Sequence, residues 1–172
     1  MQEKTVKTEE IYRGRILNLR LDTVMLPNQK EAQREVVEHP GAVAVVVRNA
    51  GGRYILIRQH RYPVKETIWE IPAGKLGRGE DPLVCAKREL AEETGLAAGA
   101  WRHLSTFYTT PGFSDEIMYL YLAEDLKVES RRPDDDEFIE TAEFTGDQLR
   151  EMIVNNAIKD AKTLVGLLWV LG

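Results

Sequence analysis

The spacing of apolar residues predicts short strands along much of the chain. Ala42–Val47 is a continuous apolar run, which is typical of a strand covered on both faces, and Glu116–Ala123 has the same character. Residues 4–38 alternate in short runs around a turn at Pro27-Asn28, which predicts a set of small strands. Further strands are predicted at Arg53–Arg58, Thr67–Ile71 and Trp101–Tyr108.

Three segments have the apolar spacing of helices. The first is Pro82–Thr94, where Asp81 can cap the first turn and Gly95 suits the left-handed conformation that ends a helix. The other two are Thr145–Asn155 and Asp160–Leu171, each beginning at a residue that can cap it. Strands on both sides of one helix, followed by two helices, predict an α/β fold in which a mixed sheet lies between helices.

Composition narrows the class of protein. The chain has 172 residues, of which 43% are apolar and 30% charged, as in an ordinary globular domain. The net charge of −5 disfavours a duplex nucleic-acid partner, which usually requires a basic face. Met1–Glu10 is polar and the apolar runs are too short to span a bilayer, so we expect no signal peptide, no membrane partner and a cytoplasmic location.

Acidic residues gather on the first predicted helix. Glu89, Glu92 and Glu93 are three and four positions apart, so a helix places them on one face, where like charges repel one another. Arg88 projects about 100° away from Glu89 on the helical wheel, so we expect no neighbouring cation to relieve this repulsion. Crowded carboxylates suit a hard divalent cation such as Mg²⁺. The helix alone also allows a solvated acidic face.

The residues around this helix follow a fixed spacing: Gly74, five residues, Glu80, seven residues, Arg88-Glu89-Leu90, one residue, Glu92-Glu93, one residue, Gly95-Leu96. The pattern resembles the Nudix box, G-x5-E-x7-R-E-u-x-E-E-x-G-u, where u is a bulky aliphatic residue. Every specified position matches, which makes this signal far more specific than a lone short motif. The resemblance implies the Nudix fold, an α/β/α sandwich with a mixed β-sheet. It also implies hydrolysis of a nucleoside diphosphate linked to another group.

The resemblance implies a role for each residue of the box. Glu89, Glu92 and Glu93 are implied to be catalytic metal ligands, together with the backbone carbonyl of Ala73. The implied cofactor is Mg²⁺, with Mn²⁺ as the other candidate. The residues implied to be structural are Gly74, Glu80, Arg88 and Gly95, with Glu80 and Arg88 forming an ion pair that orients the loop against the helix.

A segment beyond the box resembles a loop of the ADP-ribose pyrophosphatase subgroup. It reads Thr110-Pro111-Gly112-Phe113-Ser114-Asp115-Glu116, and its proline lies fifteen residues after Leu96. The resemblance makes Thr110 and Glu116 candidates for substrate binding. A plain Pro-Gly turn between two strands is the alternative.

Two further segments are similar to substrate-binding parts of the same subgroup. Residues 33–42 resemble the segment that recognises adenine, in which Arg34 would lie against the ring or reach phosphate and Glu35 would accept from the exocyclic amine. Arg61 resembles the arginine that contacts the diphosphate, a task that suits a bidentate donor. For each residue, a surface charge or a cross-strand ion pair is the alternative.

The acidic loop Asp134–Glu137 also has a counterpart in the subgroup. There an acidic residue acts as general base or binds a further metal ion. We assign Glu137 to the metal, and Asp135 or Asp136 to the base. This loop has three consecutive aspartates where relatives often have a glutamate, and a solvated loop is the alternative.

The resemblance covers roughly Val6 to Leu171 and implies one reaction: metal-dependent hydrolysis of ADP-ribose to AMP and ribose 5-phosphate. It further implies a homodimer that exchanges its N-terminal strands. We expect residues 1–40 to form an N-terminal antiparallel β-sheet lobe for dimerisation and substrate contacts, and residues 41–172 to form the catalytic domain. The rival substrates are other nucleotide sugars or nucleoside diphosphate derivatives. A non-catalytic nucleotide-binding module ranks lower, because such modules often lose box glutamates and this chain keeps them all.

Overall fold

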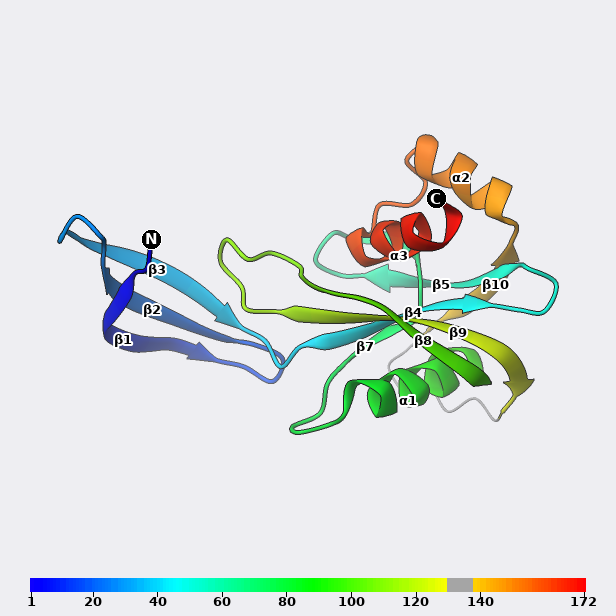
Figure 1. Ribbon diagram of the computed structural model, residues 1–172, viewed down its shortest axis with the longest axis horizontal. Coiled ribbons are helices and arrows are strands. Elements are labelled where there is room, and N and C mark those ends of the chain that lie inside the picture. The colour runs from blue at the N-terminus through cyan, green and yellow to red at the C-terminus, as the bar shows by residue number, and fades with distance from the viewer. Residues whose placement is uncertain (130–137) are drawn as a thin grey trace. The chain divides into compact units, whose positions relative to one another are not determined.

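The structure is a computed structural model that describes residues 1–129 and 138–172 (Figure 1). The chain divides into two compact units. Unit 1 comprises Met1–Gly41 and Phe107–Met118, and unit 2 comprises Ala42–Thr106 and Tyr119–Gly172. No helix in the described parts of the chain is both long and apolar enough to cross a membrane.

Unit 1 contains a three-stranded antiparallel sheet in the order β1-β2-β3. Its strands are β1 (Lys4–Arg13), β2 (Asn18–Met25) and β3 (Glu31–Glu38). The predicted turn at Pro27-Asn28 connects β2 to β3. The segment after residue 108 joins the end of β3, because Val37 N donates to Phe113 O at 2.8 Å and Val37 O accepts from Asp115 N at 3.2 Å.

Unit 2 is built on a mixed sheet with helices on both faces. The elements are β4 (Ala42–Arg48), β5 (Tyr54–Arg61), β6 (Glu66–Glu70), β7 (Ala73–Lys75), α1 (Pro82–Thr94), β8 (Leu96–Tyr108), β9 (Ile117–Val128), β10 (Glu140–Phe144), α2 (Gly146–Val154) and α3 (Ala161–Leu171). The last two residues of β8 and the first two of β9 belong to unit 1. The sheet order is β10-β5-β4-β9-β8, with β6 paired to β5 and β7 paired to β4. In Figure 1, α1 lies on one face and α3 on the other. The predicted α/β/α sandwich and the small antiparallel sheet are therefore both present.

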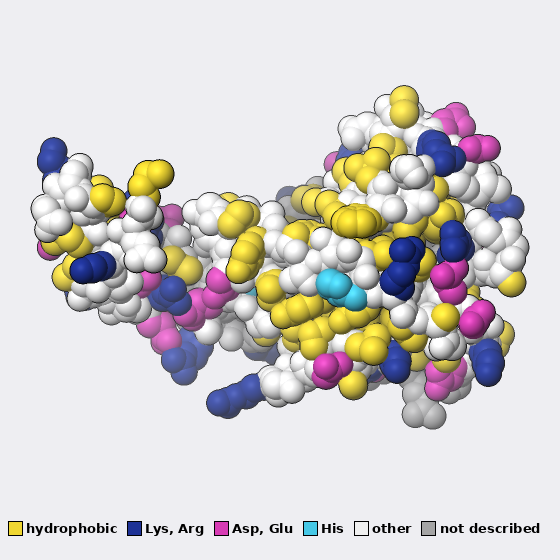
Figure 2. Space-filling model, in the orientation of Figure 1, with side chains coloured by type: hydrophobic (Ala, Val, Ile, Leu, Met, Phe, Trp, Pro, Cys, Tyr) yellow, Lys and Arg dark blue, Asp and Glu magenta, His cyan; other side chains and the backbone are white. Residues whose placement is uncertain are grey.

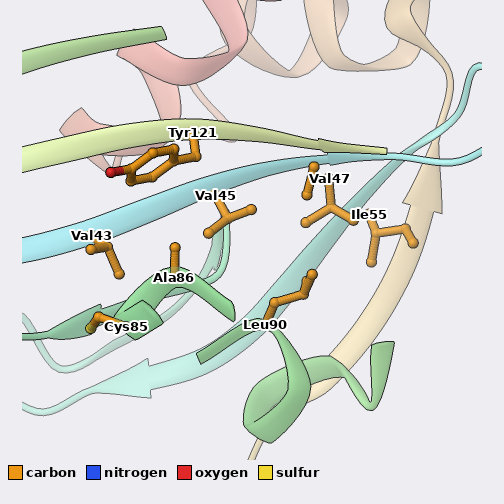
Figure 3. Close-up of a cluster of buried hydrophobic side chains, with 9 residues drawn as sticks. Val43, Val45, Val47, Ile55, Cys85, Ala86, Leu90 and Tyr121 are labelled. Atoms are coloured by element: carbon orange, nitrogen blue, oxygen red, sulfur yellow. The ribbon is translucent and has the colours of Figure 1, made fainter. Parts of the chain in front are cut away.

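Strand β4 lies at the centre of the sheet, as expected from its continuous apolar run. Its side chains alternate between the two faces of the sheet. On one face Val43, Val45 and Val47 pack against Cys85, Ala86 and Leu90 of α1 (Figure 3). On the other face Val46 lies near Gly166 of α3, where an added Cβ would meet Val46 Cγ2 at 2.9 Å. Both helices are thus seated on one strand, which fixes α1 against the sheet.

The last two helices, α2 and α3, have the predicted caps. Thr145 and Gln148 form a reciprocal capping box at α2, and Asp160 accepts from the backbone of Thr163 at α3. Hydrophobic side chains reach the surface over α3 (Figure 2), where Leu168 and Trp169 are 60% and 57% exposed. The opposite face of α3 carries the buried residues Thr163, Gly166 and Leu167.

Strands β8 and β9 are longer than the sequence indicates. The apolar pattern predicts strands at 101–108 and 116–123, whereas β8 begins at Leu96 and β9 continues to Val128. The helix ends at Gly95, which has a φ of 70°, and the chain enters β8 at the next residue. Residues 96–100 are leucine, alanine and glycine, and alanine and glycine are uncommon in strands. Residues 124–128 include Glu124, Asp125 and Lys127, which interrupt the apolar run of β9.

Candidate active site

Helix α1 presents the carboxylates of the site, and its ends are set by local interactions. The Asp81 carboxylate accepts hydrogen bonds from the backbone N–H groups of Leu83 and Val84, which satisfies donors that the first turn leaves unpaired. At the other end Gly95 adopts the left-handed conformation and donates to Ala91 O. With both ends fixed and one face packed on β4, the acidic face of the helix is held in a single orientation.

Glu93 is the most deeply placed of the three glutamates. It is 2% exposed, and its Oε2 accepts a hydrogen bond from Ala73 N at 3.0 Å. A buried carboxylate is stable only when hydrogen bonds or charges compensate its lost hydration. The contact also joins α1 to Ala73, the residue whose carbonyl the resemblance implies to be a further metal ligand. The structure therefore brings Ala73 and Glu93 together.

Arg88 corrects an expectation from the helical wheel. Its Nη1 lies 2.7 Å from Glu89 Oε1 and 2.9 Å from Glu92 Oε2, so the carboxylates do have a neighbouring cation. The wheel gives only the direction of the Cα–Cβ bond, and a long arginine side chain bends back over its own helix. The hydrogen bond with Glu80 raises the pKa of Arg88 against the opposing effect of burial, and the charge of Glu89 adds to the rise.

The expected ion pair between Glu80 and Arg88 is present, with 3.1 Å between Glu80 Oε1 and Arg88 Nε. Glu80 Oε2 also accepts from Gly77 N at 2.7 Å. These two hydrogen bonds, first that of Arg88 and then that of Gly77, lower the pKa of Glu80 to about 2. Glu80 thus stays ionised and holds the loop before α1 against the helix.

Gly74 is required by the close approach of Glu89. A Cβ at position 74 would lie 1.8 Å from Glu89 Cδ and 1.9 Å from its Oε1, distances that no real atoms adopt. The glycine therefore creates the space in which the Glu89 carboxylate lies. The side chain of Glu89 is 12% exposed, so this position is well shielded from solvent.

The donor set fits a hard divalent cation. Carboxylate oxygens of Glu89, Glu92 and Glu93 lie on one helix face, and oxygen donors of this kind are what Mg²⁺ and Mn²⁺ prefer. Within residues 1–129 and 138–172, no three acidic, histidine or cysteine side chains lie close enough together to form a preformed metal-binding cluster. The guanidinium of Arg88 instead bridges Glu89 and Glu92. Glu89, Glu92 and Glu93 would hold such an ion, which would supply positive charge to these carboxylates.

Arg61 forms a cross-strand ion pair, the alternative given for it above, and the pair belongs to a network whose members Lys162 and Asp160 were not predicted. Its Nε and Nη2 each lie 2.7 Å from an oxygen of Glu70, a carboxylate whose side chain is 1% exposed. Lys162 Nζ contacts Glu70 Oε2 and lies 3.0 Å from Asp160 Oδ1. Burial acts to raise the pKa of Glu70, but Arg61 and Lys162 lower it below its ordinary value. The sequence carries one sign of this network: Glu70 is a charged residue inside the otherwise apolar segment 68–71.

Four predicted substrate-binding residues lie in unit 1. Arg34 is half exposed and pairs with Glu3, with 2.6 Å between Arg34 Nη2 and Glu3 Oε1, and Glu35 is exposed beside it on β3. Thr110 is exposed, and its backbone oxygen accepts from Ser114 N at 3.0 Å.

The fourth, Glu116, holds two contacts near the start of β9. Its Oε2 accepts from Thr109 Oγ1 at 2.6 Å, and its Oε1 lies 3.4 Å from His39 Nδ1. The acidic-loop candidates Asp135, Asp136 and Glu137 lie outside the described residues.

Two family descriptions match the chain in tandem. The description "NUDIX domain" matches residues 38–164, and "Nucleoside diphosphate sugar hydrolase N-terminal domain" matches residues 3–37. The chain belongs to the Nudix family. The acidic face of α1, the Glu80–Arg88 pair and Gly74 are therefore parts of a Nudix box, and the chain is a Nudix hydrolase. Nudix hydrolases typically need divalent metal ions, which agrees with the oxygen donors found here.

Similar proteins span nearly the whole chain. "ADP-ribose pyrophosphatase" of Bacillus subtilis (strain 168) is 46% identical over 165 residues, covering 95% of this chain and 89% of that protein. "Methanol dehydrogenase activator" of Bacillus methanolicus is 45% identical over 168 residues, covering 96% and 91%. A solved structure, "Crystal structure of ADP compounds hydrolase", superposes with a TM-score of 0.87 at 20% identity over 99% of this chain and 92% of that one. This last likeness supports the Nudix fold.

Proposed function

We propose that this Nudix hydrolase cleaves the diphosphate of ADP-ribose to AMP and ribose 5-phosphate, with Mg²⁺ as its metal ion and Mn²⁺ as a substitute. The observation that carries the proposal is the buried Glu93 carboxylate, fixed by Ala73 N on the helix face that it shares with Glu89 and Glu92. The choice of ADP-ribose is supported by the relative named ADP-ribose pyrophosphatase, which is 46% identical over 95% of this chain.

The residues of the site have two chemical roles, metal binding and contact with the diphosphate. Glu89, Glu92, Glu93 and the carbonyl of Ala73 would hold the metal, which when bound neutralises diphosphate charge and orients a water molecule. Arg61 offers a guanidinium: the hydrogen bond with Glu70 raises its pKa against the opposing effect of burial, and the charges of Glu70 and Glu93 add to the rise. Cation contact with the diphosphate is the role we assign to it.

Two further sets of residues complete the proposal. Asp135 or Asp136 would remove a proton from the attacking water, and Glu137 would add a metal ligand. Residues 1–40 would form the N-terminal lobe, in which Arg34 and Glu35 would recognise adenine. Outside this lobe, Thr110 and Glu116 would contact the rest of the substrate. Residues 41–172 would form the catalytic domain, and we place the protein in the cytoplasm.

A panel assay tests the proposed reaction. ADP-ribose, ADP-glucose, GDP-mannose, NADH and diadenosine polyphosphates would each be incubated with the protein and Mg²⁺, and the products separated by chromatography. We expect fastest conversion of ADP-ribose, abolished by a chelator and restored by added Mg²⁺. If no compound were cut with Mg²⁺ or Mn²⁺, the protein would instead be a nucleotide-binding module.

Another nucleoside diphosphate sugar is the second candidate substrate. The match of residues 3–37 to a nucleoside diphosphate sugar hydrolase N-terminal domain favours it. Both candidates share the same metal site and the same broken bond, and they differ only in the group attached to the second phosphate. Faster cleavage of ADP-glucose or GDP-mannose than of ADP-ribose would decide for this candidate.

We further propose a homodimer in which the N-terminal strands are exchanged. All ten residues of β1 are exposed, among them Val6, Ile11 and Tyr12 at 55%, 52% and 58%. Hydrophobic side chains are visible on the surface of unit 1 in Figure 2. Exposed apolar side chains on a strand suit a protein partner. Light scattering should give about twice the chain mass of 19.6 kDa, and an active species of one chain mass would contradict the dimer.

A further inference from the structure

A network of buried charges lies outside the Nudix box, where α3 begins. Lys162, in the first turn of α3, reaches Glu70 at the end of β6, although 92 residues separate them in the sequence. The side chain of Lys162 is 12% exposed and that of Glu70 is 1% exposed. Two cations, Lys162 and Arg61, therefore converge on a single buried carboxylate, and Lys162 also contacts Asp160.

Attachment of α3 to the sheet does not account for this network. Thr163 already makes that attachment, because its Oγ1 accepts from Ile71 N at 2.9 Å and donates to Asp160 at 2.6 Å. Buried ion pairs add little net stability, since the desolvation of each charge offsets the attraction. A hydrophobic residue at 162 would serve attachment equally well, so the lysine calls for another explanation.

The geometry of Arg61 supplies one. The guanidinium uses Nε and Nη2 for Glu70, and no described residue accepts a hydrogen bond from its Nη1. A bidentate pair fixes the plane of both groups, so the orientation of the Glu70 carboxylate determines the orientation of Arg61. Lys162 holds Glu70 Oε2 from the side of α3. The side chain of Arg61 remains 41% exposed, so a ligand can still reach it.

We propose that Lys162 is a positioning residue for diphosphate binding. It fixes the Glu70 carboxylate, which in turn aims the free edge of Arg61 at the substrate. The inference rests on the proposed function, in which Arg61 contacts the diphosphate. It adds a residue of α3 to a site otherwise formed by the Nudix box and by Arg61 of β5.

Four variants test the inference: Lys162→Met, Arg61→Lys, the double variant that combines them, and Lys159→Met. Lys159 is a matched control, because it pairs at 2.6 Å with Glu66 on β6 but is 50% exposed. Binding of the non-hydrolysable analogue α,β-methylene ADP-ribose would be measured by calorimetry, and KM and kcat on ADP-ribose by product analysis. Urea unfolding would show that each variant is folded.

We expect Lys162→Met to raise both the Kd of the analogue and the KM about tenfold, because small displacements of a positioning group weaken binding strongly. The control should change neither. The double variant should bind no more weakly than Arg61→Lys alone, because Lys162 acts through Arg61. Independent, multiplicative losses from the two substitutions, or a Lys162→Met protein that binds as the control does, would overturn the inference.

Folding of the variants and the panel assay together distinguish a failure of this inference from a failure of the proposed function. If Lys162→Met failed to fold, Lys162→Gln would replace it, since it keeps a donor for Glu70 without the charge. Failure of both to fold would show a structural requirement and overturn the inference. If the wild-type protein cut another diphosphate faster than ADP-ribose, only the proposed substrate would fall, and the same variants would be tested on that compound and its methylene analogue. A wild-type protein that neither cut nor bound any compound of the panel would overturn both.

Discussion

Replacing Gly74 with alanine tests how closely the metal site depends on the position of Glu89. The new Cβ would stand 1.8 Å from Glu89 Cδ, whereas Cβ atoms essentially never approach other atoms within 3.0 Å. The carboxyl carbon must therefore move by about 1.2 Å or more, and a displacement of about 1 Å in a catalytic group can cost about 100-fold in rate. The move also breaks the 2.7 Å contact with Arg88, which costs about 1–3 kcal/mol of stability.

The assay compares Gly74→Ala with Gly51→Ala. Gly51 lies in the hairpin between β4 and β5, and an added Cβ there would be 3.3 Å from Asn49 Oδ1, which a small side-chain shift relieves. We expect Gly74→Ala to lower kcat/KM about 100-fold and to need more Mg²⁺ for half-maximal activity. Its free energy of unfolding in urea should fall by no more than about 3 kcal/mol. Gly51→Ala should match the wild type in all three measurements.

Either of two results would refute this reasoning. Activity near that of the wild type in Gly74→Ala would show that the chain accommodates the methyl group without moving Glu89. A loss of activity with unchanged Mg²⁺ dependence would show that Glu89 matters for something other than holding the metal. In both cases the role given to Gly74 as the residue that makes room for a metal ligand would be wrong.

Three further predictions follow from contacts of the site. Thr163→Val removes the acceptor of Ile71 N and should lower the free energy of unfolding by about 1–3 kcal/mol in urea, whereas Thr163→Ser should stay near the wild type. The pKa of Glu80 is lowered from 4.5 to about 2, so its contribution to stability is present above pH 4.5 and disappears as the pH falls toward 2. Glu80→Gln should therefore destabilise the protein far more at pH 7 than at pH 2, and an equal loss at both would contradict the ion-pair account. Glu93→Gln keeps an oxygen for Ala73 N, so the variant should fold normally yet lose several orders of magnitude in turnover, and near-full activity would refute its role as a metal ligand.

Local sequence rules predict well where an interaction spans a few residues. Helix α1 begins after Asp81 and ends before Gly95 as expected, because a cap and a glycine act within one turn. The acidic face follows from helical geometry in the same way. The helical wheel was wrong for Arg88, because it describes the direction in which a side chain leaves the helix and not how far a flexible one can bend back.

Residues close together in the chain are enough to predict the apolar strand β4, the helices with their caps, and the carboxylates of the Nudix box. Long-range packing was needed to show that Glu70 is buried between Arg61 and Lys162, and that Ala73 N donates to Glu93. Arg61 and Glu70 lie on neighbouring strands, but Lys162 reaches Glu70 only when α3 packs on the sheet, and Glu93 reaches Ala73 only when α1 does. Periodicity shows that a face is apolar or acidic, but packing decides which partner that face meets.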